Sequence, residues 1–199
     1  MAILLVRHGE TNGNAARVVQ GPEVPLNERG IEQAARLAER LLALGYAHVL
    51  CSDLVRARMT AEPLRARAGV VIEETPLLQE RNFGDLRGRA YADLGVDPFD
   101  PAYVPPNGES VQAFHHRIAR AFELIVERRR GLSGALVVVT HGLVCHAIVT
   151  NHTRGGVMPQ FFENTGVTEI DPEPPHPARL VNCTRHLVPA GRSGAAGSY

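Results

Sequence analysis

Two apolar stretches of this chain end on the same dipeptide, His-Gly. The first, "LLVRHG", ends on Arg7, His8 and Gly9, and the second, "VVVTHG", ends on His141 and Gly142. Each stretch has the pattern of a buried strand, and the carboxyl ends of parallel strands meet at one edge of a sheet. We therefore expect the two imidazoles, which can serve as nucleophile, proton carrier or metal ligand, to face each other there.

Arginine side chains accompany the two histidines. Arg56 in "VLCSDLVRARMTAE" follows a third strand pattern and falls on the first turn of a predicted helix, so its guanidinium can reach the same edge as Arg7. Two fixed cations repel a divalent metal ion and attract an anion. Planar guanidinium groups clamp the oxygens of a phosphoryl group in pairs, which leaves an imidazole nitrogen free to attack phosphorus.

A metal site has less support in the sequence. His146 and His152 could join His141, but no cysteine or carboxylate stands beside them at the usual ligand spacing. We therefore predict no metal and no cofactor.

Composition narrows the class of protein further. With 199 residues, 44% hydrophobic and 21% charged, the chain can bury the core of one α/β domain, and its formal charge of zero argues against nucleic-acid or anionic-membrane partners. All 21 basic residues are arginine, which excludes a P-loop or Schiff-base lysine. The first apolar run is interrupted by Arg7 and is too short for a signal peptide or membrane span, so we expect a cytoplasmic protein.

Strand and helix patterns alternate along most of the chain. This alternation predicts a three-layer α/β sandwich, with a mostly parallel central sheet and helices on both faces. The strands are expected at 3–6, 48–51, 70–73, 135–140, 167–170 and 178–183. The helices are expected from Asn27 to Gly45, from Ser52 or Asp53 to Arg67, from Ser110 to Arg130 and over 143–151, with Ile31 and Leu42 on the buried face of the first.

The remaining segments are irregular. Residues 74–108 are rich in Pro, Gly, Asp and Arg without a steady period, which predicts a long surface excursion with a short helical turn near 91–94. Residues 1–188 are expected to form a single domain. Residues 189–199, rich in Gly, Ala and Ser, are expected to be a disordered tail.

The chain resembles the histidine phosphatase superfamily, the group that includes cofactor-dependent phosphoglycerate mutases and many small-molecule phosphatases. The resemblance covers almost the whole chain and rests on the order and spacing of several motifs: "LLVRHGETNGN", "QGPEVPLNERGIEQA", "CSDLVRARMTAE", "LLQERNFGDLRG", "PPNGES", "VVVTHG", "ENTGVTEI" and "NCTRHL". It implies the phosphoglycerate mutase-like fold and a small phosphorylated metabolite as substrate.

The resemblance also implies roles for particular residues. His8 matches the nucleophile that forms a phosphohistidine, and Glu80 matches the acid that protonates the leaving alkoxide. The residues matching the phosphate pocket and its accessory contacts are Arg7, Asn14, Gln20, Gly21, Arg56, His141 and Gly142.

Each of these residues also has a plainer interpretation. His8 and His141 could be satisfied histidines at strand ends, and Arg56 could be one more solvated helix charge. Glu109 competes with Glu80 as a carboxylate in the same part of the chain, although it is well placed to favour a helix N-terminus. A further group could either contact the non-phosphate part of a substrate or lie on the surface: Arg81, Arg87, Arg89 and Tyr91.

Three functions compete at this point. The favoured hypothesis is a metal-independent phosphatase acting on a small phosphorylated metabolite. A phosphoglycerate mutase would share the core residues, but mutases usually carry extra residues in the middle of the chain, for which this chain has little room. The third is a catalytically silent protein that binds a phosphorylated ligand, against which His8 and Glu80 argue. The sequence predicts no particular oligomeric state.

Overall fold

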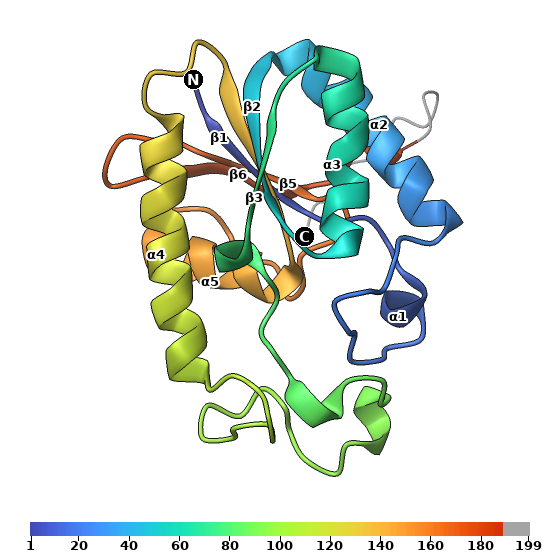
Figure 1. The fold of residues 1–199 in the computed structure, drawn as a ribbon. Helices are drawn as coiled ribbons and strands as arrows, with labels where there is room; N and C mark the ends of the chain where they lie inside the picture. The colour runs from blue at the N-terminus through green and yellow to red at the C-terminus, as the bar shows by residue number, and fades with distance from the viewer. Residues whose placement is uncertain (189–199) are drawn as a thin grey trace, which may run out of the picture.

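A six-stranded sheet forms the centre of the computed structural model, which describes residues 1–188 (Figure 1). The strand order is β3-β2-β4-β1-β5-β6. The first four strands of this order are parallel; at the other edge β5 pairs antiparallel with β1, and β6 pairs antiparallel with β5. The bounds are β1 (Ile3–Arg7), β2 (Tyr46–Ser52), β3 (Ile72–Thr75), β4 (Ala135–Thr140), β5 (Val167–Ile170) and β6 (Ala178–Cys183). The predicted mostly parallel α/β sheet is confirmed.

Helices cover both faces of this sheet (Figure 1). The pair α2 (Glu28–Leu44) and α3 (Val55–Ala68) covers one face, and the pair α4 (Val111–Arg129) and α5 (Gly142–His152) covers the other. Because successive side chains of a strand point to opposite faces, Leu4 and Val6 pack under the first pair and Ile3 and Leu5 under the second. No helix within residues 1–188 has the length and apolar character needed to cross a bilayer.

Four local predictions about these elements were wrong. β2 begins two residues earlier than expected, at Tyr46, and β3 begins two residues later, at Ile72. The N-cap of α3 is Leu54, because the Ser52 hydroxyl is used to accept a hydrogen bond from the Leu54 N–H (3.3 Å) rather than to cap the helix. On α2, Ile31 is 52% exposed and Leu42 44% exposed. The polar Gln33 is buried on α2, since its side-chain oxygen accepts the Glu10 N–H (2.8 Å).

The predicted surface excursion is a structured segment. It contains three short 3-10 turns: Pro76–Leu78, Gly84–Leu86 and Tyr91–Asp93. The last of these is the expected turn, and the other two were missed. Phe83, Leu86 and Leu94 pack with Val19 into a small core of their own. This green segment extends past the end of the sheet in Figure 1, so it stands over the edge where the chemistry-bearing residues lie.

The predicted tail, 189–199, lies outside the described residues. The helices α4 and α5 begin and end within two residues of their predicted bounds, and Ser110 caps α4 as expected by accepting the Ala113 N–H (3.1 Å).

Candidate active site

The two imidazoles of the His-Gly dipeptides meet at the carboxyl end of the sheet. β1 and β4 are parallel neighbours that pair Arg7 with Thr140, and the pairing continues one step as the His8 N–H donates to the Thr140 carbonyl (2.8 Å). The rings of His8 and His141 consequently lie with their centroids 5.1 Å apart. His8 is 3% exposed and His141 is fully buried.

The environment of His8 fixes both its charge and its tautomer. Burial lowers its pKa well below the usual histidine range, and the nearby charges of Arg56 and Arg7 lower it further. The ring is therefore neutral near pH 7. Its Nδ1 lies 2.7 Å from the Gly9 carbonyl oxygen, which can only accept, so Nδ1 carries the proton. The lone pair is left on Nε2, which is the state that a nucleophile needs.

Glycine follows His8 because the chain passes extremely close to α2 at that point. A Cβ on Gly9 would lie 2.6 Å from the Gly30 carbonyl oxygen, and a Cβ on Gly30 would lie 2.1 Å from the Glu10 carbonyl oxygen. Neither position has room for a side chain. The Gly9 N–H then donates to the Thr60 hydroxyl (3.0 Å), which ties the loop after β1 to α3.

Arg7 and Arg56 are held at this edge by backbone carbonyls. The Arg56 Nη1 donates to the Gly21 carbonyl (2.9 Å), and the Arg7 Nη1 donates to the Phe162 carbonyl. Burial lowers the pKa of both guanidinium groups, and the Glu80 carboxylate opposes this shift. Both side chains stay charged, since arginine does not deprotonate in proteins.

Three buried polar atoms around His8 have no hydrogen-bond partner within residues 1–188. They are Arg7 Nε, Arg56 Nε and His141 Nδ1. A buried donor without an acceptor destabilises a fold by about 1–3 kcal/mol, so such atoms are uncommon outside functional sites. Two cationic donors and an imidazole nitrogen gathered about a neutral histidine form a site suited to a phosphoryl group.

His141 is fully buried next to the His8 ring. Its Nε2 lies 2.9 Å from the Ser52 hydroxyl oxygen. Burial lowers the pKa of His141 well below its usual range, and the Arg56 charge adds to the shift. The ring is therefore neutral, and its Nδ1 is the atom without a partner.

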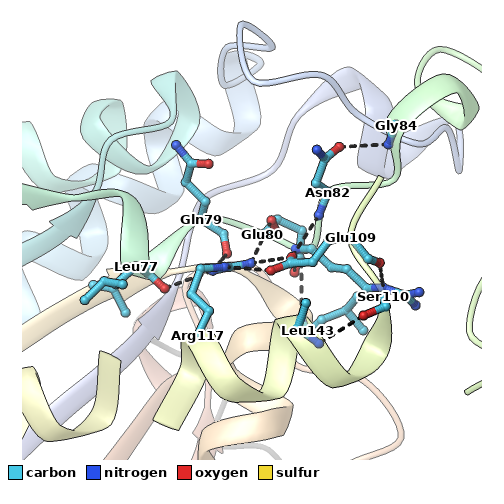
Figure 2. A network of polar contacts seen from close by, with 12 residues as sticks. Leu77, Gln79, Glu80, Asn82, Gly84, Glu109, Ser110, Arg117 and Leu143 are labelled. Atoms are coloured by element: carbon cyan, nitrogen blue, oxygen red, sulfur yellow. Dashed lines mark hydrogen bonds and ion pairs between the residues drawn. The ribbon is translucent and has the colours of Figure 1, made fainter. Parts of the chain in front are cut away.

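Two backbone N–H groups hold the Glu80 carboxylate in place (Figure 2). Its Oε1 accepts from the Arg81 N–H (2.9 Å), and its Oε2 accepts from the Leu143 N–H (3.2 Å) at the start of α5. Burial raises the pKa of the carboxyl above its usual range, although both N–H groups and the two arginines pull it down. A raised pKa suits a group that must hold a proton and then release it.

Arg117 of α4 fixes the backbone that carries Glu80, as Figure 2 shows. Its Nη1 donates to the Leu77 carbonyl (2.9 Å) and the Gln79 carbonyl (2.8 Å). Its Nε and Nη2 pair with the two oxygens of Glu109 (3.0 and 2.7 Å). Glu109, the competing carboxylate, is therefore in an ion pair with Arg117, while Glu80 faces the cavity.

The cavity beside His8 has a volume of about 640 Å³ and contains most of the expected accessory residues. Asn14, Gln20 and Gly142 line it. Gly21 does not line it, and instead supplies the carbonyl that holds Arg56. Sequence reasoning missed Asn164, which lines the same cavity and donates from Nδ2 to the His8 carbonyl (3.0 Å). Asn164 belongs to the motif "ENTG", which is part of the family resemblance.

The four residues whose roles were open divide between the cavity and the scaffold. Tyr91 lines the cavity. Arg81 is buried, and its guanidinium donates to three backbone carbonyls. Arg89 donates to the Asp93 carbonyl (2.6 Å), and Arg87 lines a second hollow, which Gly21 also lines. Of the four, Tyr91 alone is placed to meet a substrate.

The histidines considered as metal ligands do not gather. His146 lines the cavity, whereas the ring of His152 stacks on Phe122 of α4 (centroids 4.9 Å apart). Across residues 1–188 the structure contains no group of three or more His, Cys, Asp or Glu side chains that could hold a metal ion.

Comparisons with known proteins agree with this geometry. The family model of the histidine phosphatase superfamily (branch 1) matches residues 3–183. A curated relative, phosphoglycerate mutase-like protein 4 of Arabidopsis thaliana, is 37% identical over 161 residues, covering 73% of this chain and 68% of its own.

Solved structures of similar proteins superpose over nearly the whole length. The alpha-ribazole phosphatase of Shigella flexneri is 28% identical with a TM-score of 0.78, covering 92% of this chain and 97% of its own. The YhfR protein of Bacillus stearothermophilus is 30% identical with a TM-score of 0.81, covering 93% of this chain and 98% of its own. The chain belongs to the histidine phosphatase superfamily and is an enzyme of that class.

Proposed function

We propose that this enzyme is a metal-independent phosphomonoesterase that hydrolyses a small phosphorylated metabolite through a phosphohistidine. One observation carries the proposal: a neutral His8, with its lone pair on Nε2, lies among buried guanidinium nitrogens that lack acceptors. The phosphoryl oxygens of a substrate would supply those acceptors. The name of a similar solved structure, the alpha-ribazole phosphatase of Shigella flexneri, is consistent with this choice of reaction.

In the first step, the Nε2 lone pair of His8 attacks phosphorus as the bond from phosphorus to the alcohol oxygen breaks. The Glu80 carboxyl gives its proton to the departing alkoxide, which leaves as a neutral alcohol. Proton transfer of this kind contributes about 10²- to 10⁴-fold to a rate. The raised pKa of Glu80 keeps a larger fraction of the acid form near neutrality than an exposed glutamate would have.

In the second step, water attacks the phosphohistidine. The Glu80 carboxylate accepts one proton of the water as its oxygen bonds to phosphorus and the bond to Nε2 breaks. Inorganic phosphate leaves, and His8 and Glu80 return to their starting protonation states. Arg7 and Arg56 flank the transferred group in both steps, where fixed cations stabilise the charge on its oxygens. The Nδ1 of the neutral His141, which has no partner within residues 1–188, would donate to one of these oxygens.

The experiment is a phosphate-release assay on a panel of phosphomonoesters, with the wild type beside His8→Ala. We expect release by the wild type, unchanged by a chelator, and loss of at least about 10³-fold in the variant because the nucleophile is gone. Strong inhibition by the chelator would contradict the metal-free reaction. Equal, negligible activity in both proteins would support a silent binding protein instead.

A phosphoglycerate mutase is the second candidate, because a curated relative carries a mutase-like name. Both reactions begin with the same phosphohistidine and differ in whether water or a second hydroxyl takes the phosphoryl group. Incubating the protein with 3-phosphoglycerate, with and without a bisphosphoglycerate primer, separates them. Primer-dependent isomerisation faster than phosphate release would replace hydrolysis as the function.

A further inference from the structure

The cavity beside His8 has two chemically different ends. Its inner end carries the reacting and phosphate-binding groups: Arg7, His8, Arg56 and Glu80. Its outer end is lined by apolar side chains from three separate segments of the chain: Phe83, Tyr91, Val96, Phe99, Leu143 and Phe161. A substrate phosphate at the inner end would therefore leave the alcohol part of the ester against an apolar wall.

The aromatic rings of this wall pack against one another. Tyr91 and Phe99 are stacked, with centroids 5.7 Å apart and planes 23° apart, and Phe99 meets Phe83 edge to face at 6.0 Å. Phe83 is buried, whereas Phe99 keeps 49% of its surface exposed. Phe161 approaches the same cavity from the other loop and is 67% exposed. Two large exposed rings at one cavity mouth offer flat apolar surface to a ligand.

Arg81 holds this wall in place. Its buried guanidinium donates to the Pro98 (2.9 Å), Tyr103 (3.0 Å) and Glu109 (3.0 Å) carbonyls, and lies 5.3 Å from the centre of the Phe83 ring. These bonds join the loop that carries Phe99 to the segment that carries Phe83. The ring pair is therefore preorganised, which lowers the entropy lost when a ligand packs against it.

Charges at the outer end do not favour an anionic alcohol part. Arg17 and Asp97 are the charged residues among the described lining residues outside the inner end, and both are exposed. These two charges are opposite in sign, so the outer end carries no net charge that would attract a second carboxylate or phosphate. Arg81 and Arg89, which could have supplied another cation, are directed at backbone carbonyls.

We propose that the natural substrate is a phosphate monoester whose alcohol part carries an uncharged aromatic ring, which packs against Tyr91, Phe99 and Phe161. This inference rests on the proposed phosphomonoesterase activity. It excludes a phosphorylated sugar acid as the preferred substrate, because such an alcohol part would place a carboxylate against the aromatic wall.

The test compares esters that leave as primary alkoxides, so that leaving-group acidity does not decide the outcome. The substrates are 2-phenylethyl phosphate, butyl phosphate and glycerol 3-phosphate, with 3-phosphoglycerate as the anionic case. We expect kcat/KM for 2-phenylethyl phosphate to exceed that for glycerol 3-phosphate by about tenfold or more, mostly through KM, since one well-placed ring contact has about that effect.

Variants assign the preference to the wall. Phe99→Ala and Phe161→Ala should each lower the ratio of kcat/KM for 2-phenylethyl over glycerol 3-phosphate by about five- to tenfold. Val104→Ala is the matched control, because Val104 is exposed on the same loop as Phe99 but does not line the cavity. It should keep the wild-type ratio.

Failure of this inference can be told apart from failure of the activity itself. Equal kcat/KM for all four esters, or a preference for 3-phosphoglycerate that Arg17→Ala removes, would overturn the aromatic substrate while leaving a His8-dependent phosphatase. Absence of His8-dependent release from every ester would instead overturn the phosphomonoesterase on which the inference rests. The aromatic-substrate proposal would also be overturned if Phe99→Ala and Phe161→Ala both kept the wild-type ratio of kcat/KM for 2-phenylethyl phosphate over glycerol 3-phosphate.

Discussion

The two ends of the cavity are built from different kinds of structure. The inner end stands on the carboxyl ends of β1 and β4 and on the first turn of α3, where strand pairing sets each side chain's position. The outer end stands mostly on the irregular segments around 76–108 and 153–166, with Leu143 added from the first turn of α5. A regular sheet edge can hold reacting groups in fixed positions, whereas loops can change in length and side chains without disturbing it. We infer that the inner end determines the reaction and the outer end determines the substrate.

Glu80 lies in the irregular segment 76–108, but we assign it to the reaction. A Glu80 variant therefore tests most severely whether the inner end determines the reaction and the outer end the substrate. Glu80→Gln should lower kcat/KM for 2-phenylethyl phosphate by about 10²- to 10⁴-fold, because no acid remains for the departing alkoxide. The loss should be smaller for 4-nitrophenyl phosphate, whose leaving group needs less protonation. Steady-state kinetics on both esters measures the difference.

Glu109→Gln is the matched control for that variant. Glu109 is paired with Arg117 and should affect the rate only through the position of the backbone. If Glu109→Gln lost more activity than Glu80→Gln, the acid would have been assigned to the wrong carboxylate.

Removing a cation of the inner end should affect all substrates alike. Arg56→Met should lower kcat/KM by about 10²- to 10³-fold for every ester of the panel, because a charged donor facing the transferred group is lost. Arg58→Met is the control, since Arg58 lies two residues along α3 with its side chain about half exposed. A change in the ratio between esters in Arg56→Met would show that the two ends are not separate.

Arg117 is expected to act as a positioning residue for Glu80. Arg117→Met should lower kcat by about tenfold with a smaller change in KM, because the backbone of Leu77 and Gln79 loses its donor and the carboxyl moves out of line. Burial raises the pKa of Glu80, so a more solvated Glu80 should lose its proton at lower pH. The alkaline limb of the rate profile should therefore shift to lower pH.

Two further variants separate positioning from general destabilisation. Arg117→Lys keeps the charge but not the paired donors, so it should recover part of the rate. Arg120→Met, one turn along α4 on the exposed side, should leave both the rate and the pH profile unchanged. A loss of thermal stability in Arg117→Met with an unmoved pH profile would reduce Arg117 to a scaffold role.

The smallest expected effect concerns stability and pH. The pKa of His8 is lowered well below its unfolded value of about 6.5, so the unfolded chain binds more protons as the pH falls. The buried, neutral His8 therefore costs no stability above about pH 6.5. As the pH falls from there towards the folded pKa, the free energy of unfolding decreases by up to about 1.4 kcal/mol per pH unit.

Urea unfolding between pH 7.5 and 5.5 in phosphate-free buffer measures this slope. His8→Asn should have a shallower slope than the wild type, whereas His116→Gln, which alters an exposed histidine of α4, should keep the wild-type slope. Identical slopes in all three proteins would mean that His8 is not held neutral by burial.

The sequence predicted the inner end more completely than the outer one. β1 and β4 were predictable because long apolar runs of Ile, Leu and Val leave few alternatives to a buried strand, and the polar residues that follow must then lie at the edge. The motif resemblance assigned Glu80 in advance. The choice between Glu80 and Glu109 depends on the ion pair of Glu109 with Arg117. The sequence places Arg117 on a helix but does not show which groups it binds.

The outer end was not predictable because no periodic pattern connects its residues. Phe99 and Phe161 are 62 positions apart in loops, and which side a loop residue faces depends on tertiary contacts such as those of Arg81. Tertiary contacts also explain why the predicted N-cap of α3 was wrong. Ser52 has the right side chain for a cap, but the Leu54 N–H and the His141 ring use its hydroxyl.

The central claim, that His8 Nε2 accepts the phosphoryl group, is tested most directly by trapping the intermediate. A ³²P-labelled phosphomonoester is mixed with the enzyme, quenched within milliseconds in alkali, and the protein is digested and mapped. The account predicts a label on the peptide that contains His8, stable in alkali and released by mild acid, and absent from His8→Asn. A fully active enzyme that carries no such label at any quench time would contradict it.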